Sequence, residues 1–154
     1  HPSTASGVAQ KQGTRYTVAL DGNMINNETI YHEIAHIISA RLEWDSLIRE
    51  DAMYSEDAWM ALQPEGFSYA MVYRDVPEEY QQYIDAGYFI NEYSMTFSTE
   101  DRSEVMSEAM SLEHWRFEKG TGLRSKLQFY ADCIRDCFDT TGWPEVTRWE
   151  RVLG

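Results

Sequence analysis

The chain has 154 residues, enough for one domain with a sizeable hydrophobic core, and no internal repeat or linker divides it. Its 26 acidic and 13 basic residues give a formal charge of −13, which would repel phosphate backbones and anionic membranes. Nucleic acid is therefore not an expected partner, and no apolar run is long enough to span a bilayer.

The N-terminal part predicts little regular structure apart from one strand. Residues 1–13 are mostly small or polar and predict a flexible lead-in to a single domain over residues 14–154. β-Branched and aromatic residues over 14–20 predict a strand that ends at Asp21-Gly22. The first residue is His1 rather than Met, so we expect a processed product or a fragment.

The first predicted helix covers residues 27–43, and Asn26 or Asn27 is its expected N-cap. Isoleucines recur at helical spacing on one side of it, so we expect that side to face the core. They are Ile30, Ile34 and Ile37.

The stretch from 44 to 97 gives mixed signals, because large aromatic residues alternate with turn-forming ones. Pro77 begins a predicted short helix that ends at Gly87. Residues 88–97 show no clear period, and we expect an extended or looping crossover there.

Helices dominate the C-terminal third. Ser98, with Asp101 three residues later, predicts the N-cap of a helix over 98–119. A second helix over 122–138 carries a clear apolar stripe, and a last short helix is expected from Trp143-Pro144 to about residue 152. The predicted fold class is therefore α+β and predominantly helical, with a small sheet ahead of the first helix.

Two cysteines lie one turn apart in the helix predicted over 122–138. A disulfide between Cys133 and Cys137 would be awkward within one regular helix. With no other Cys or His nearby, they are a weak metal signal, and we expect small core residues.

The residues best suited to metal binding and catalysis lie in the first predicted helix, which contains His32-Glu33-Ile34-Ala35-His36. Residues four apart lie about 40° from each other around a helix and one turn apart, so both imidazoles can reach one ion. In the His-Glu-x-x-His pattern the glutamate lies beside the metal and acts as a general base.

A catalytic zinc normally has a third protein ligand. His-x-x-Gly-x-x-His does not follow, since Ser39 and Leu42 stand where Gly and His would be needed, which excludes the metzincin layout. The remaining candidates are His114 and two carboxylates of the helix over 98–119, Glu104 and Glu108.

His32-Glu33-x-x-His36 followed by Glu104-Val105-Met106-Ser107-Glu108 resembles the gluzincin metallopeptidases. The second stretch is also similar to one in the catalytic domain of anthrax lethal factor. Residues 93–104 resemble predicted secreted bacterial zinc peptidases, in which Tyr-Ala/Ser-x-Thr precedes Glu-Asp-x-x-Glu. The resemblance implies a zincin-like fold and a secreted or cell-surface location.

The same resemblance implies a set of roles. One Zn²⁺ per chain would be held by His32, His36 and Glu104, and Glu108 would orient His32. Glu33 would be the general base and Tyr93 would donate its phenol proton to the developing oxyanion. The expected activity is hydrolysis of peptide bonds in a peptide or protein substrate.

Other interpretations stay open. The domain could bind a metal without catalysis, or be a helical interaction domain with no metal. Glu104 and Glu108 also fit an ordinary acidic helix face, and Tyr93 a packing role.

Overall fold

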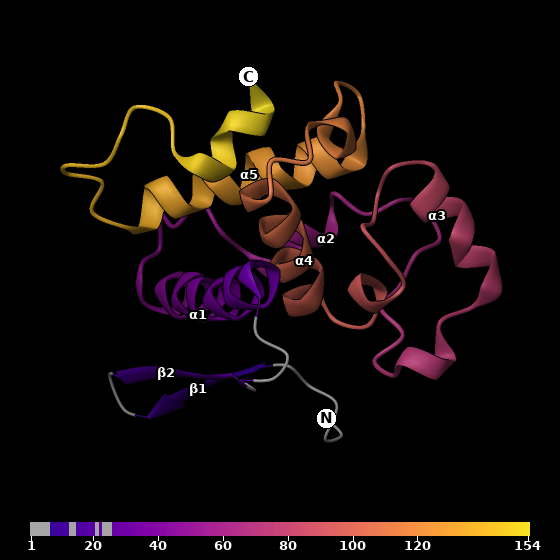
Figure 1. The fold of residues 1–154 in the computed structure, drawn as a ribbon, viewed down its shortest axis with the longest axis horizontal. Helices are drawn as coiled ribbons and strands as arrows, with labels where there is room; N and C mark the ends of the chain where they lie inside the picture. Colours follow the sequence, from indigo (N-terminus) through magenta and orange to yellow (C-terminus); the bar gives the residue numbers. More distant parts are fainter. Residues whose placement is uncertain (1–6, 13–14, 21, 23–25) are drawn as a thin grey trace.

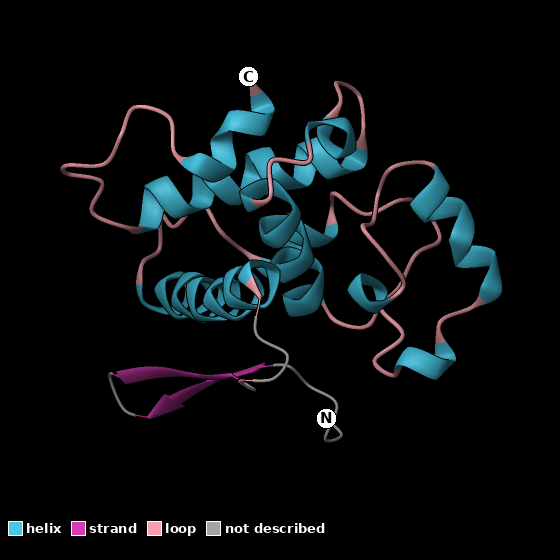
Figure 2. Cartoon of the chain, viewed as in Figure 1, coloured by secondary structure: helices cyan, strands magenta, loops and turns pink. Residues whose placement is uncertain are grey.

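The structure is a computed structural model that describes residues 7–12, 15–20, 22 and 26–154. The fold is α+β and mostly helical, with a single hairpin of strands in the described part of the chain (Figures 1 and 2). The elements, with η for 3₁₀ helices, are β1 (Gly7–Gln12), β2 (Arg15–Leu20), α1 (Asn27–Ile48), α2 (Glu56–Met60), η1 (Tyr73–Asp75), η2 (Glu78–Tyr80), α3 (Gln81–Asp85), η3 (Tyr93–Met95), α4 (Ser98–Met110), η4 (His114–Phe117), α5 (Gly122–Cys137) and η5 (Arg148–Leu153).

The two strands form an antiparallel hairpin that lies along α1 (Figure 1). Gly7 pairs with Leu20 and Gln12 with Arg15. The strand predicted over 14–20 is confirmed as β2, but the lead-in prediction is wrong for residues 7–12, which form β1. The rest of that lead-in, together with Asp21, lies outside the described residues.

Helix α1 begins where the sequence indicates, because Oδ1 of Asn26 accepts a hydrogen bond from the backbone nitrogen of Thr29 at 2.8 Å. It continues to Ile48, five residues beyond the predicted end. Its N-terminal half carries both motif histidines.

The core side of α1 differs from the prediction. Ala35, Ser39 and Leu42 are buried, whereas Ile34 is 44% exposed. Small residues on this side let the neighbouring helices approach closely, and the hydroxyl of Tyr130 donates to the carbonyl oxygen of Ala35 at 3.2 Å. The isoleucine side was therefore the wrong choice of core face.

Helix α4 lies between α1 and α5 (Figure 1). Met106 packs in one core cluster with Ala35 of α1, while Val105 packs in another with Leu127 of α5. The helix ends at Met110, nine residues before the predicted end, and the chain turns at Leu112, whose φ is 61°. This ending was not predicted because no glycine marks it.

The start of α4 at Ser98 agrees with the prediction, but the cap differs. Its N-cap is Phe97 with no side-chain cap, so the predicted Ser98 cap is wrong. Helix α5 matches its prediction closely and is capped by Thr121, whose side chain accepts from the backbone nitrogen of Arg124. The last helix, η5, starts later than predicted, at a capping box formed by Thr147 and Glu150.

The remaining predictions are largely confirmed. Pro77 is the N-cap of η2, which continues into α3, and the chain turns at Gly87 with a φ of 81°. Residues 88–97 are irregular except for η3. Cys133 is buried, Cys137 is partly buried, and both are free thiols. Among the described residues, no helix combines the length and hydrophobicity needed to cross a membrane.

Candidate metal centre

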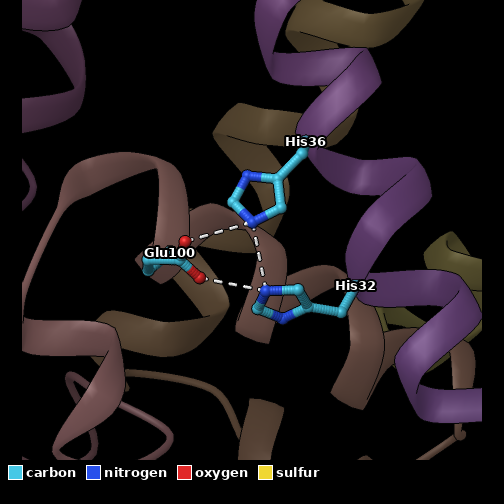
Figure 3. Close-up of side chains that lie close together, drawn as sticks. All are labelled: His32, His36 and Glu100. Atoms are coloured by element: carbon cyan, nitrogen blue, oxygen red, sulfur yellow. Dashed lines mark hydrogen bonds and ion pairs between the residues drawn. The ribbon is translucent and has the colours of Figure 1, made fainter. Parts of the chain in front are cut away.

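Helices α1 and α4 bring three potential metal ligands together (Figure 3). Nε2 of His32 lies 2.9 Å from Oε2 of Glu100, and Nε2 of His36 lies 3.2 Å from Oε1 of the same carboxylate. The two Nε2 atoms are 3.1 Å apart. Two imidazoles from one turn of α1 therefore face one carboxylate from the first turn of α4.

The spacing of these atoms can be compared with that of a zinc site. Zinc binds imidazole nitrogen and carboxylate oxygen at about 2.0–2.2 Å, so adjacent ligand atoms of a tetrahedral site are separated by about 3.3 Å. The observed separations of 2.9, 3.1 and 3.2 Å are slightly shorter, but the 2.9 and 3.2 Å distances go to different oxygens of Glu100. With one donor atom per residue, the three atoms lie within 4.8 Å of one another. Oε2 of Glu100 is buried, and the described contact that it makes is the one with Nε2 of His32.

Neighbouring charges stabilise ionised Glu100. Burial alone would raise the pKa of this carboxyl, but the adjacent imidazoles of His32 and His36 outweigh that effect and lower it to about 2. Burial likewise favours neutral His32, but Glu100, Glu104 and Glu33 together raise the pKa of the imidazole above its ordinary value. Glu100 and the imidazoles thus stabilise each other's charged forms, and a bound cation would compete with the protons of those imidazoles.

Glu104, the carboxylate predicted as third ligand, lies one turn further along α4. Its Oε1 is 3.6 Å from Nδ1 of His32, on the opposite side of the imidazole from Glu100. Burial raises the pKa of Glu104, and the charge of Glu100 adds to this, although His32 and Asn91 act in the opposite direction. Glu104 thus faces Nδ1 of His32 at a distance longer than a hydrogen bond.

Glu108, predicted to orient His32, lies a further turn away. Its Oε2 is 3.8 Å from Nε of Arg116, and burial raises its pKa despite that guanidinium. His114, the alternative ligand in the sequence, is exposed at the start of η4. The described contacts of Glu108 and His114 join them to neither motif histidine.

The two residues predicted to act on substrate lie beside this cluster. The Glu33 side chain is largely buried, and its charge acts on both His32 and Tyr93. The Tyr93 ring centroid lies 6.3 Å from that of His32. Burial raises the pKa of the Tyr93 phenol, and Glu100 and Glu104 raise it further, so the hydroxyl keeps its proton at neutral pH.

Sequence reasoning did not select Glu100 as a ligand, although a signal was present. Three glutamates recur every four residues on α4, at positions 100, 104 and 108. The Glu-x-x-x-Glu pattern therefore occurs twice, and its first copy is Glu100 to Glu104. In that first copy, Glu100 stands where the resemblance puts the metal ligand, and Glu104 stands where it puts the carboxylate that orients a histidine.

Comparisons with known proteins give no independent indication of family. No family model, no curated protein and no solved structure matches the chain.

Proposed function

We propose that the protein is a zinc-dependent hydrolase that cleaves peptide bonds, with His32, His36 and Glu100 as the metal ligands. The observation that carries this proposal is the convergence of those three donors at 2.9–3.2 Å beside Glu33. The proposal replaces Glu104 with Glu100 as the third ligand, because each oxygen of Glu100 lies within that distance of one Nε2 atom, whereas Glu104 lies 3.6 Å from Nδ1 of His32.

Zinc is the preferred ion because two imidazoles and one carboxylate are a common ligand set of catalytic zinc sites. When bound, it would polarise the scissile carbonyl and make a bound water more acidic. The remaining roles belong to side chains of this chain.

Glu33 is the proposed general base. It precedes His36 by three residues on α1, about 60° away around the helix, so its carboxylate lies toward the side that carries the imidazoles. It would take the proton from the attacking water and pass it to the leaving nitrogen. Tyr93 would donate a hydrogen bond to the oxygen on which negative charge develops, because its phenol stays protonated.

Glu104 is the proposed orienting carboxylate. By attracting the proton of His32 to Nδ1, it would leave the Nε2 lone pair directed at the cation. This is the role that the sequence resemblance assigns to Glu108, moved one turn toward the start of α4.

Exposed apolar side chains next to Tyr93 favour a substrate with large apolar residues near the cleaved bond. The backbone nitrogen of Met71 donates to the carbonyl oxygen of Thr96 at 2.9 Å, which puts Met71 beside Phe97. The Tyr73 ring centroid is 6.5 Å from that of Tyr93. Met71, Tyr73 and Phe97 are all exposed, and hydrocarbon presented to solvent beside a reactive site is suited to substrate contact.

The test is digestion of a peptide library by the zinc-loaded protein, followed by mass spectrometry. Glu33→Gln is the matched control, because it keeps the shape of the side chain but removes the base. We expect cleavage by the wild type, a loss of about 10²–10⁴-fold in Glu33→Gln, and equal zinc content in both.

Two results would contradict the proposal. Zinc bound without turnover of any peptide would favour a non-catalytic metal-binding domain. Absence of stoichiometric metal after loading would instead favour a helical interaction domain.

A further inference from the structure

Three charged side chains directly behind the candidate metal centre are completely buried. Asp101 and Arg102, the two residues after Glu100, are 0% exposed, and so is Lys126 of α5. Burying a charge costs on the order of several kcal/mol, even after the surrounding protein relaxes. Apolar residues would fill the same volume at lower cost, so the stability of the fold alone does not account for these charges.

Arg102 joins α4 to α1. Its Nε donates to Oγ of Ser39 at 3.0 Å, and its Nη2 donates to Oε1 of Glu43 at 2.7 Å. Ser39 and Glu43 follow His36 by three and seven residues, so they lie on the same side of α1 as the motif histidines. The guanidinium is thus hydrogen-bonded to α1 on the C-terminal side of the two imidazoles.

Further contacts hold the same turn of α4 from its other sides. Nη1 of Arg102 lies 3.4 Å from Oε2 of Glu56 in α2. Asp101 accepts hydrogen bonds from Nζ of Lys126 at 2.8 Å and from the Tyr69 hydroxyl at 2.6 Å. Nζ of Lys126 also donates to the backbone oxygen of Tyr88 at 2.7 Å. The first turn of α4 is therefore tied to α1, α2 and α5.

A directional contact is needed to fix the position of this turn of α4 along α1. Glu100, Glu104 and Glu108 form a strip with a period of four residues, so a shift of α4 by four residues, about 6 Å, would present the wrong carboxylate to the histidines. Apolar contacts between helices are not directional and discriminate weakly between such registers. Hydrogen bonds from a planar guanidinium to fixed partners do discriminate.

We propose that Arg102 is a positioning residue that sets the register of α4 on α1 and thereby selects Glu100 as the third metal ligand. This inference rests on the proposed function. It assigns the buried charge to metal geometry rather than to the stability of the fold.

Loss of the Arg102 guanidinium should change the metal affinity without a matching loss of fold stability, although these two quantities usually change together. Glu43 and Glu56 are 45% and 49% exposed, so they stay solvated when the guanidinium is removed. Ser39 keeps its contact with the Tyr130 hydroxyl at 3.3 Å, and Asp101 keeps Lys126. Replacing Arg102 with Met, of similar length, should therefore leave the protein folded while it loosens the metal site.

The experiment compares the wild type with Arg102→Met and Arg102→Lys. Arg135→Met is the matched control, because Arg135 joins α5 to Glu150 by hydrogen bonds of 2.6 and 2.7 Å on another part of the surface. Each full-length protein is assayed for its metal-free melting temperature and for zinc affinity by competition with a chromophoric chelator. The visible absorption spectrum of the Co²⁺-loaded protein reports the coordination geometry.

We expect Arg102→Met to fold, to lose at least tenfold in zinc affinity and to change the Co²⁺ spectrum, with Arg102→Lys between it and the wild type. Arg135→Met should change the melting temperature and neither metal measurement. If Arg102→Met has the zinc affinity and the Co²⁺ spectrum of the wild type, the positioning role of Arg102 is refuted and the proposed function is not affected. A wild-type protein that binds neither ion would overturn the proposed function as well.

If Arg102→Met does not fold, Glu43→Gln decides, because it weakens the same contact from a half-exposed position on α1. A reduced zinc affinity with an altered Co²⁺ spectrum supports the inference. An unchanged affinity and spectrum would overturn it.

Discussion

Replacing Glu100 with Gln should cost far more zinc affinity than the same replacement at Glu104. The oxygens of Glu100 lie 2.9 and 3.2 Å from the Nε2 atoms of His32 and His36. Oε1 of Glu104 lies 3.6 Å from Nδ1 of His32, on the outer side of that ring. Gln keeps the volume of each side chain and removes its charge, so the two variants compare position rather than size.

The expected magnitudes follow from these places. Structural zinc sites bind with apparent free energies of about 10–16 kcal/mol, which is about 2.5–4 kcal/mol for each of four ligands and about 10²–10³-fold in affinity. An outer carboxylate contributes about 10–100-fold. Because 3.6 Å is longer than a hydrogen bond, we expect the lower limit, about tenfold, for Glu104→Gln.

The assay is competition for zinc with a chromophoric chelator at neutral pH. Glu108→Gln is the control, because Glu108 pairs with Arg116 instead of an imidazole, and its affinity should match the wild type. The melting temperature of each metal-free protein shows that the fold is retained. If Glu104→Gln loses binding while Glu100→Gln keeps it, the ligand assignment from the structure is wrong and the one from the sequence resemblance is right.

Three further results are expected. Tyr93→Phe should keep zinc affinity and lower kcat by about 10²–10³-fold, as loss of an oxyanion donor does, and an unchanged kcat would exclude that role. Hydrogen bonds from Arg135 hold the pKa of Glu150 at about 2, below its ordinary 4.5, so this group stabilises the fold fully above pH 4.5 and loses its effect as pH falls toward 2. The melting temperature of wild type should therefore drop more steeply over that range than that of Glu150→Gln, and parallel curves would refute the linkage. Leu127→Ala empties a fully buried position between α4 and α5 and should cost about 2–5 kcal/mol in urea unfolding, whereas a cost below about 1 kcal/mol would mean that the core there is not packed as described.

Local signals in the sequence located α1 and α5 well. Asn26 offers a side-chain cap at the residue where α1 begins, and the apolar stripe over 122–138 indicates α5. The end of α4 was missed because Leu112 adopts a positive φ without the glycine that usually marks such a turn. Its start at Ser98 was predicted correctly, but Ser98 is not the cap, because the N-cap is Phe97, which has no side-chain cap.

The choice between Glu100 and Glu104 could not be made from spacing. Residues four apart lie on one side of a helix, so a repeating glutamate strip gives the face but not the turn that meets the partner helix. The turn is decided by contacts over long sequence separations, such as that between Arg102 and Ser39. For the same reason, periodicity could not tell the isoleucine side of α1 from the side of Ala35, on which the core is built.

The donors of the candidate centre come from helices that are far apart in the chain, His36 on α1 and Glu100 on α4. A cation held between them would act as a cross-link that exists only in the folded state, so ligation and folding would be one coupled equilibrium. Free zinc at a hundred times its dissociation constant would add about 2.7 kcal/mol to the free energy of unfolding. A chelator would then lower the melting temperature of the whole domain, and the resistance of this protein to heat would depend on the zinc supply around it.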